Sequence, residues 1–374
     1  NINALSVAAS MGVSYSNSVN VTVSGAGAVA INSIRGKTNA FVQDSQIKQA
    51  GEVNLTAENN SGISSTVVAA SASVSVSQNV SVGVSIGVAV ARNFIGYSLS
   101  GGQDSLEVKA YTQESSINAD QGLTLSAYSD QKISSVVISG SVAVAVGTGC
   151  TGVAVSGAGV YAQNKIFTDT MAYMEKDSNA GLTAEQITLT SENTSSIFSH
   201  AGAASVAGSY GGTAGVSVSV GVSLARNNID NNVQAYVQDA DQGVTSKSGS
   251  IELQASNSAK IKSIAWAGSI AAGFGGTAGV NVSGAGTGAK NIIQGGTKAY
   301  IEASQVQSAT EVQIDALDLS SVNAFILGAS LAAGGGGAAG VSVSISASLA
   351  RKIIGWKKKE DKEIDHTTEN DPAQ

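Results

Sequence analysis

The chain has 374 residues, of which 44 are Gly, 13% are charged and 5% are aromatic, and its formal net charge is −7. The excess of acids argues against a general nucleic-acid binder, because phosphate affinity depends on clustered Lys and Arg. A single cysteine, Cys150, excludes an internal disulfide framework. The apolar residues are mostly Ala and Val, so we expect a thin, sheet-like core.

Alternation of apolar and polar residues with a period of two dominates the chain and predicts β-strands throughout. Two long alternating segments, such as 63–77 and 80–93, are joined by a corner of small or polar residues. Two shorter strands follow, such as 108–111 and 123–127. The almost uncharged segment 136–159 is interrupted by Ser or Gly, which indicates a strand and no membrane span. No signal peptide is visible, so we expect a piece of a longer protein.

One sequence pattern recurs along the chain, and its clearest short motif, or word, is Ala-x-Asn. The third residues of this word are Asn32, Asn93, Asn164, Asn227 and Asn291, with Lys352 in a degenerate sixth copy. A second word, Ala followed by an aromatic residue, places Phe41, Tyr111, Tyr173, Tyr236 and Tyr300. The spacing predicts a repeat of about 63 residues, typical of stacked architectures.

The repeats also alternate in pairs. Odd copies read Ser-Gly-Ala-Gly before Ala-x-Asn, as at 24–27, 156–159 and 283–286. Even copies place Ile or Val after the Ser, as at Ile86, Val220 and Ile345. Bulky even strands packed beside Gly-rich odd strands would explain this alternation, and so would drift after duplication.

We predict an all-β, repetitive β-solenoid, or parallel β-helix, over residues 1–356, followed by a charged tail at 357–374 that acts as a cap or linker. A repeat of about 63 residues divides into three coils of about 21. The alternative is an elongated sandwich of stacked antiparallel hairpins, because corners such as Gly211-Gly212 and Gly275-Gly276 are also hairpin signals. In both folds the object is elongated, and an open end would favour end-to-end association or pairing with a neighbouring repeat.

The recurring residues have structural interpretations. We expect the asparagines to satisfy backbone groups at a turn. The aromatic column is interpreted as a plug that fills the widest corner of each repeat, or alternatively as a stripe on which carbohydrate stacks.

Catalytic and metal chemistry has little support in the sequence. His200 and His366 are far apart, and neither is near Cys150, which we interpret as a packed residue. The Gly-rich corners lack the Asp of calcium-binding loops. The acids near the aromatic word should lie about 14 Å apart on a solvated face, given three coils between them; they are Asp44, Glu114, Asp177, Asp239 and Glu302. The cations after Ala-x are not expected to cluster; they are Arg92, Lys165, Arg226, Lys290 and Arg351. We therefore expect no enzyme, no metal and no cofactor.

The words Ala-Tyr-Ile-x-x-Ser-x-Val (299–306), Val-x-Ile-x-Ala (312–316) and Gly-Val-x-Val-Ser carry a family resemblance. They resemble the repeats of very large bacterial surface and secreted proteins of the haemagglutinin, leukotoxin and adhesin type, exported by autotransporter or two-partner routes. The resemblance implies a β-helical, non-catalytic stalk or filament segment outside the bacterial cell. A binding module that recognises a glycan or host receptor through a repeated flat face is the alternative.

Overall fold

The computed structural model describes residues 1–100 and 102–355, and every regular element in them is a β-strand. The predicted tail at 357–374 and His366 lie outside the described residues. The first sheet contains six long strands: β1 (Ile2–Ser16), β6 (Gly62–Ser77), β10 (Lys132–Gly147), β13 (Ser196–Gly211), β17 (Lys260–Gly275) and β21 (Ser321–Gly336).

The second sheet holds the strands that follow these in the chain. Its long strands are β2 (Val19–Ile34), β7 (Val80–Ile95), β11 (Thr151–Ala184), β14 (Ala214–Gln238), β18 (Ala278–Glu302) and β22 (Ala339–Ile354). Its shorter strands are β3 (Lys37–Gln43), β4 (Gln46–Ala50), β8 (Leu106–Ala119), β15 (Val244–Ser246) and β19 (Val306–Gln307). The third sheet contains β5 (Val53–Asn59), β9 (Gly122–Ser129), β12 (Gln186–Asn193), β16 (Ile251–Asn257) and β20 (Val312–Asp318).

Consecutive long strands do not pair with each other. β1 pairs in parallel with β6, with Ile2 opposite Ile63, while β2 pairs in parallel with β7, with Val19 opposite Val80. The corner between β1 and β2 is therefore an arc that carries the chain from one sheet to the other. The antiparallel hairpin alternative is wrong, and the chain has the parallel strands in stacked sheets that characterise a β-solenoid.

The expected division of each repeat into three coils is also wrong. Ile2 lies directly opposite Ile63, so no coil intervenes between one repeat and the next. The physical reason is strand length. β6 and β7 contain 16 residues each, so these two strands together are already longer than a coil of about 21 residues. We call each circuit of the three sheets a rung, and number the rungs one to six from β1, β6, β10, β13, β17 and β21; the described residues of the sixth rung form β21 and β22.

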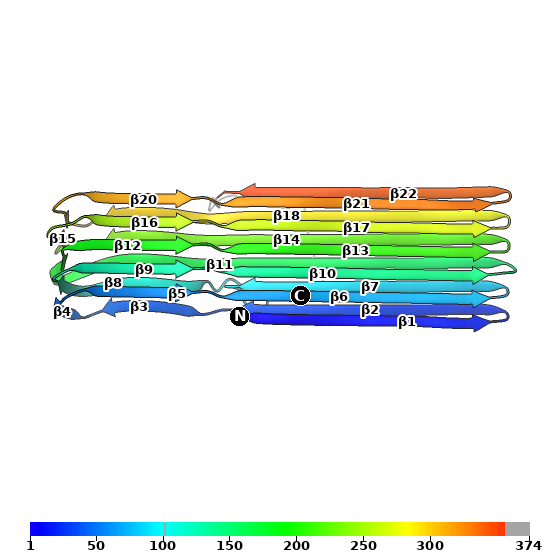
Figure 1. Ribbon diagram of the computed structural model, residues 1–374, viewed down its shortest axis with the longest axis horizontal. Coiled ribbons are helices and arrows are strands. Elements are labelled where there is room, and N and C mark those ends of the chain that lie inside the picture. Colours follow the sequence, from blue (N-terminus) through cyan, green and yellow to red (C-terminus); the bar gives the residue numbers. More distant parts are fainter. Residues whose placement is uncertain (101, 356–374) are drawn as a thin grey trace.

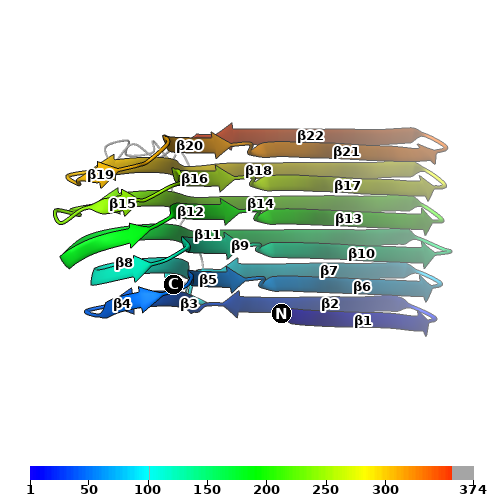
Figure 2. The ribbon, with the colours of Figure 1, turned by 60° about the vertical axis from the view of Figure 1, so that its left-hand side comes forward.

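The described part of the molecule is a slab. Its long strands run straight along the longest axis and stack in chain order, with the shorter strands at the end opposite the arcs (Figures 1 and 2). Neighbouring strands are about 4.8 Å apart, so six rungs add only about 29 Å in the stacking direction. The expected elongation along the stack is absent over the described residues, because each rung is wider than six rungs are tall.

The core has two zones that differ in side-chain size. Between the long strands it consists of small groups such as Ala69, Ala89 and Ala203, all at most 1% exposed. Beside the third sheet it contains larger groups such as Leu125 and Ile187, which are fully buried. Small side chains let the two long sheets approach closely, whereas the larger ones fill the wider end. Burial of each Leu or Ile contributes about 1.5–3 kcal/mol.

Serine hydroxyls cross the narrow zone from sheet to sheet. Ser71 and Ser85 are buried with their Oγ atoms 2.7 Å apart, and Ser205 and Ser219 repeat the contact at 2.8 Å. The inner face of the long sheets thus has small, partly polar side chains, and some of its hydroxyls pair across the sheets, whereas others, such as those of Ser73 and Ser139, have no hydrogen-bond partner among the described residues.

Candidate functional site

The Ala-x-Asn asparagines form one continuous column inside the second sheet. Their side chains are linked from rung to rung, each Nδ2 donating to the Oδ1 of the next, over distances of 2.7 to 2.9 Å from Asn32 through Asn93, Asn164 and Asn227 to Asn291. All five side chains are buried. Such a ladder satisfies one donor and one acceptor of each inner amide, those of Asn93, Asn164 and Asn227, without water.

The ladder differs from the expected turn role. These amides hydrogen-bond to one another within straight strands, not to backbone groups at a corner. Parallel, in-register pairing explains the difference, because it places each amide about 4.8 Å from an identical one. At the sixth rung Lys352 lies opposite Asn291, and the Nδ2 of Asn291 has no hydrogen-bond partner among the described residues.

The aromatic residues of the second word form a stacked column. Neighbouring ring centroids lie 4.8 to 5.1 Å apart with interplanar angles of 8° or less, from Phe41 through Tyr111, Tyr173 and Tyr236 to Tyr300. The adjacent residues Ala110, Ala172 and Ala235 are fully buried, so the rings point to the opposite, outer face. The interpretation as a plug inside the repeat is therefore wrong.

Stacking also determines what the aromatic column presents to solvent. The inner rings cover each other's faces, and Tyr173 is only 9% exposed, whereas Phe41 at the first rung is 52% exposed. The pKa of the Tyr173 phenol is raised well above its ordinary value of 10.0, mainly by burial and additionally by the charges of Tyr111 and Glu175. The same cause raises the pKa of Tyr236. A sugar ring stacks on the face of an aromatic ring. The faces of the inner rings are covered by their neighbours, so this column presents only ring edges to a sugar.

Charged side chains lie beside the aromatic column. Lys37 Nζ and Lys109 Nζ contact the two carboxylate oxygens of Glu107 at 2.9 and 3.3 Å. Burial opposes ionisation of Glu107, but the hydrogen bond from Lys37 and the charge of Lys109 outweigh it and lower its pKa. Lys176 lies 3.8 Å from Glu114 on the adjacent rung.

The acids near the aromatic word are closer together than the expected 14 Å, because adjacent rungs are about 4.8 Å apart. Asp44, Glu114 and Asp239 share one turn position with positive φ, which Lys176 takes on the third rung and Ala303 on the fifth. The other two acids lie elsewhere, with Asp177 opposite Ser115 and Glu302 opposite Gln238. Lys176 therefore interrupts the row of like charges.

The cations after Ala-x do cluster, contrary to expectation. Arg226 lies opposite Lys290, which lies opposite Arg351, and Arg92 aligns with the same column through Gln163. Lys165 lies in the next outward column, with its Nζ 5.9 Å from the centroid of Phe94. A hollow of about 280 Å³ lies along this column of cations, and its lining contains no carboxylate, His or Cys. We call this column the basic row.

Neither Cys150 nor His200 belongs to a reactive cluster. Cys150 is exposed in an arc, so its interpretation as a packed residue is wrong. It shares its position with Thr213 and Thr277, and a small residue at an arc is as compatible with exposure as with packing. His200 Nε2 accepts a hydrogen bond from the indole nitrogen of Trp266 at 2.9 Å. Among residues 1–100 and 102–355, no group of three or more His, Cys, Asp or Glu is placed to hold a metal ion.

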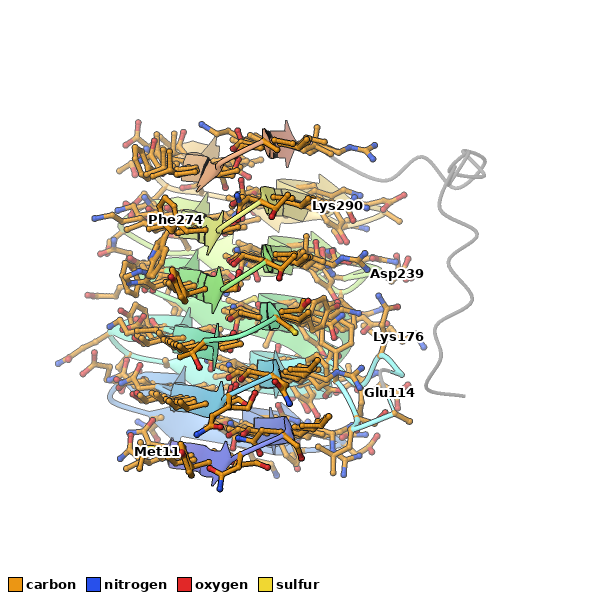
Figure 3. The ribbon with its side chains drawn as sticks, turned by 90° about the vertical axis from the view of Figure 1, so that its right-hand side faces the viewer. Met11, Glu114, Lys176, Asp239, Phe274 and Lys290 are labelled. Atoms are coloured by element: carbon orange, nitrogen blue, oxygen red, sulfur yellow. The ribbon has the colours of Figure 1, made fainter. Side chains whose placement is uncertain are left out.

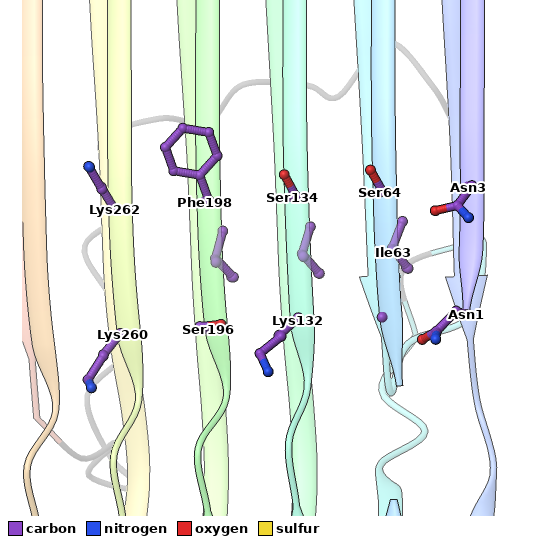
Figure 4. A pocket seen from close by; sticks show the side chains of 13 residues that line it. Asn1, Asn3, Ile63, Ser64, Lys132, Ser134, Ser196, Phe198, Lys260 and Lys262 are labelled. Atoms are coloured by element: carbon purple, nitrogen blue, oxygen red, sulfur yellow. The ribbon is translucent and has the colours of Figure 1, made fainter. Parts of the chain in front are cut away.

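A shallow hollow of about 500 Å³ crosses the start of the first-sheet strands (Figure 4). Its lining combines Lys132, Lys260 and Lys262 with Phe198 and the ends of buried isoleucines. Lys132 pairs with Asp130, and Lys262 Nζ lies 5.9 Å from the centroid of the Phe198 ring. These side chains lie on rungs three, four and five and do not converge on one point (Figure 4).

Sequence reasoning did not identify the apolar outer faces of the two long sheets. Figure 3 shows side chains projecting from both sides of the slab, with Met11 and Phe274 on the first-sheet side. Met11 is 76% exposed and Phe274 is 52% exposed. The signal was present in the alternation, because Ala and Ser at the inner positions leave Val, Ile and Leu for the outer ones.

No protein-family model, curated protein or solved structure matches this chain. Within the described ranges, no helix has the length and apolar character needed to cross a membrane.

Proposed function

We propose that this chain is a non-catalytic structural segment, a stalk or filament, of a large bacterial cell-surface or secreted adhesin-like protein. Its repeat of about 63 residues would be one rung, stacked on the preceding and following repeats of the same longer chain. The observation that carries the proposal is the continuity of the stacked columns. The asparagine and aromatic columns run through successive rungs, and each of the first five rungs supplies one unit to both.

The open strand edges support association along the stack. β1 pairs only with β6 and β22 pairs only with β18 among the described strands, so each leaves one edge for a further strand. We propose neighbouring repeats of the parent chain, or a second chain end to end, as the partners at these edges.

A tandem-insertion experiment tests the stalk proposal. Residues 132–259 form two complete rungs, so copies of this segment inserted after Ala259 preserve both the register and the odd–even alternation. Each inserted pair should lengthen the particle by about 9.6 Å in the stacking direction and raise the unfolding midpoint towards a plateau. Small-angle scattering and electron microscopy measure the length. Particles of unchanged length, or insertions that unfold, would contradict the proposal.

The alternative function, glycan recognition by the aromatic column, has less support because the ring faces are mutually covered. Saturable binding on a glycan array that is lost in Tyr236→Ala but kept in Tyr236→Phe would favour this alternative over a purely structural role.

A further inference from the structure

The outer face of the second sheet is a continuous apolar surface. It is made by the outward side chains of segments 19–29, 80–90, 151–161, 214–224, 278–288 and 339–349, and we call it the valine face. Two columns of the valine face are Val in all six rungs: Val21, Val82, Val153, Val216, Val280 and Val341; and Val23, Val84, Val155, Val218, Val282 and Val343. No outward side chain in these segments is charged.

Beside the valine columns the surface is corrugated with a period of two rungs. Even rungs raise bulky side chains, such as Ile86 at 50% exposed and Val220 at 43% exposed. In the same column the odd rungs have glycine, including Gly157 and Gly284. The next outward column repeats this pattern over the first five rungs, and its sixth rung has Ala347. Over these two columns, ridges on even strands thus alternate with furrows on odd strands, about 9.6 Å from ridge to ridge.

The fold itself does not require these glycines. A Cβ atom added to Gly157, Gly159, Gly284 or Gly286 would meet nothing within 4 Å, and none of these residues has a positive φ. The inward Gly152 differs, because a Cβ there would lie 2.2 Å from the backbone oxygen of Tyr210. Glycine weakens a strand interior unless a backbone bend or a close approach requires it. The furrow glycines therefore point to a partner outside the rungs described.

We propose that the valine face is an interface between two copies of this chain, in which the even-rung ridges of each copy occupy the odd-rung furrows of the other. A two-fold axis parallel to the strands produces this fit, because it brings the faces together and can oppose every even rung to an odd rung. The long strands are straight and evenly stacked (Figure 1), and flat sheets can pack face to face with aligned strands about 10 Å apart.

The size of the face is sufficient for a stable dimer. Eleven residues along each strand and six rungs give about 36 Å by about 29 Å, or about 1,000 Å² per copy. Standard protein interfaces bury about 800 Å² per partner. An exposed apolar surface this large exceeds the patches of a few hundred Å² found on typical monomers. The basic row borders the face, and the two-fold axis would place two such rows side by side.

The test is the oligomeric state of the full chain across a concentration series, measured by analytical ultracentrifugation. The double variant Gly157→Val/Gly159→Val fills one furrow at two positions where an added Cβ atom meets nothing within 4 Å, and β-branched residues favour strands. We expect it to keep or raise the unfolding midpoint while weakening dimerisation at least tenfold. Val220→Lys should weaken dimerisation similarly by placing a charge on a ridge. The matched control is Val142→Lys, a similarly exposed valine on the first sheet, which should leave dimerisation unchanged.

Several outcomes would overturn this proposal. One is a wild-type chain that stays monomeric at about 100 µM; another is assembly that the furrow-filling variant does not weaken. Equal weakening by Val142→Lys would place the contact on the other face. Monomers that bind phosphatidylcholine vesicles through the valine face would show that lipid, and not a second copy, occupies it. End-to-end association is distinguishable, because the furrow residues of the double variant lie on the central strand β11, away from both open edges.

Discussion

Asn93 and Asn164 are 71 residues apart in the sequence, yet the side-chain nitrogen of Asn93 donates a 2.9 Å hydrogen bond to the side-chain oxygen of Asn164. The same bond recurs between Asn164 and Asn227. Each inner asparagine is therefore held from above and below in a buried column. Removing one of them leaves a donor on one side and an acceptor on the other without a partner.

Asn164→Ala should lower the free energy of unfolding by about 1–3 kcal/mol, because two buried amide groups lose their hydrogen bonds. Urea denaturation followed by circular dichroism measures the change. The matched control is Asn54→Ala, at an exposed position of β5, which should stay within about 0.5 kcal/mol of the wild type. Equal effects of the two substitutions would show that the ladder does not stabilise the fold.

The aromatic stack makes a separate contribution. Tyr236 stacks on Tyr173 and Tyr300, so Tyr236→Ala should cost about 1–3 kcal/mol of stability, given about 0.5–1.5 kcal/mol for each aromatic pair. Tyr236→Phe keeps both stacks and should be nearly neutral. The control Tyr210→Ala removes a half-exposed tyrosine outside the column. If it destabilises the protein as much as Tyr236→Ala, stacking is not the cause.

Alkaline pH should weaken the fold through the same column. The pKa values of Tyr173 and Tyr236 are raised by burial, so the unfolded chain releases these phenolic protons at a lower pH than the folded chain does. The resulting stability is present below about pH 10 and is lost as the pH rises through the higher folded values. Denaturant titrations from pH 8 upwards measure this loss. The double variant Tyr173→Phe/Tyr236→Phe should show a shallower fall, and an unchanged fall would contradict the assignment.

Cys150 should react in the native protein. It is exposed in the arc between β10 and β11, so a thiol reagent needs no unfolding to reach it. We expect labelling by dithionitrobenzoate at a rate within about tenfold of that in denaturant, and Cys150→Ser should alter stability by less than about 0.5 kcal/mol. Labelling that occurs only after denaturation would show that the thiol is packed.

Chelation should leave the fold intact. The described carboxylates, histidines and thiol do not gather into a metal site. The melting temperature with an excess of ethylenediaminetetraacetate should therefore match that without it. A fall of more than about 10 °C would reveal a bound ion that stabilises the folded state.

The sequence predicted the positions of strands and repeats better than it predicted which strands pair with each other. Period-two alternation and the Ala-x-Asn word located the long strands, because both are local patterns. The corner at Gln78-Asn79 is compatible with a hairpin or an arc, since a turn does not determine which strand its neighbours bond to. Only the pairing of Val80 with Val19 and Thr151 settles that choice. The sequence places Ala110 and Tyr111 on opposite faces of one strand, but it does not say which face is inside. The structure buries Ala110, and Tyr111 therefore points outward.

The small advance per rung determines what kind of support this architecture can give. A particle about 100 Å tall needs about 21 rungs, and at about 63 residues per rung it needs about 1,300 residues. Height therefore requires a very long polypeptide, but each rung adds a wide, hydrogen-bonded layer. The resulting particle is a flat slab. It resists bending within the plane of its sheets much more strongly than bending perpendicular to the sheets, where the slab is thin. Under lateral force it should deflect in one preferred direction.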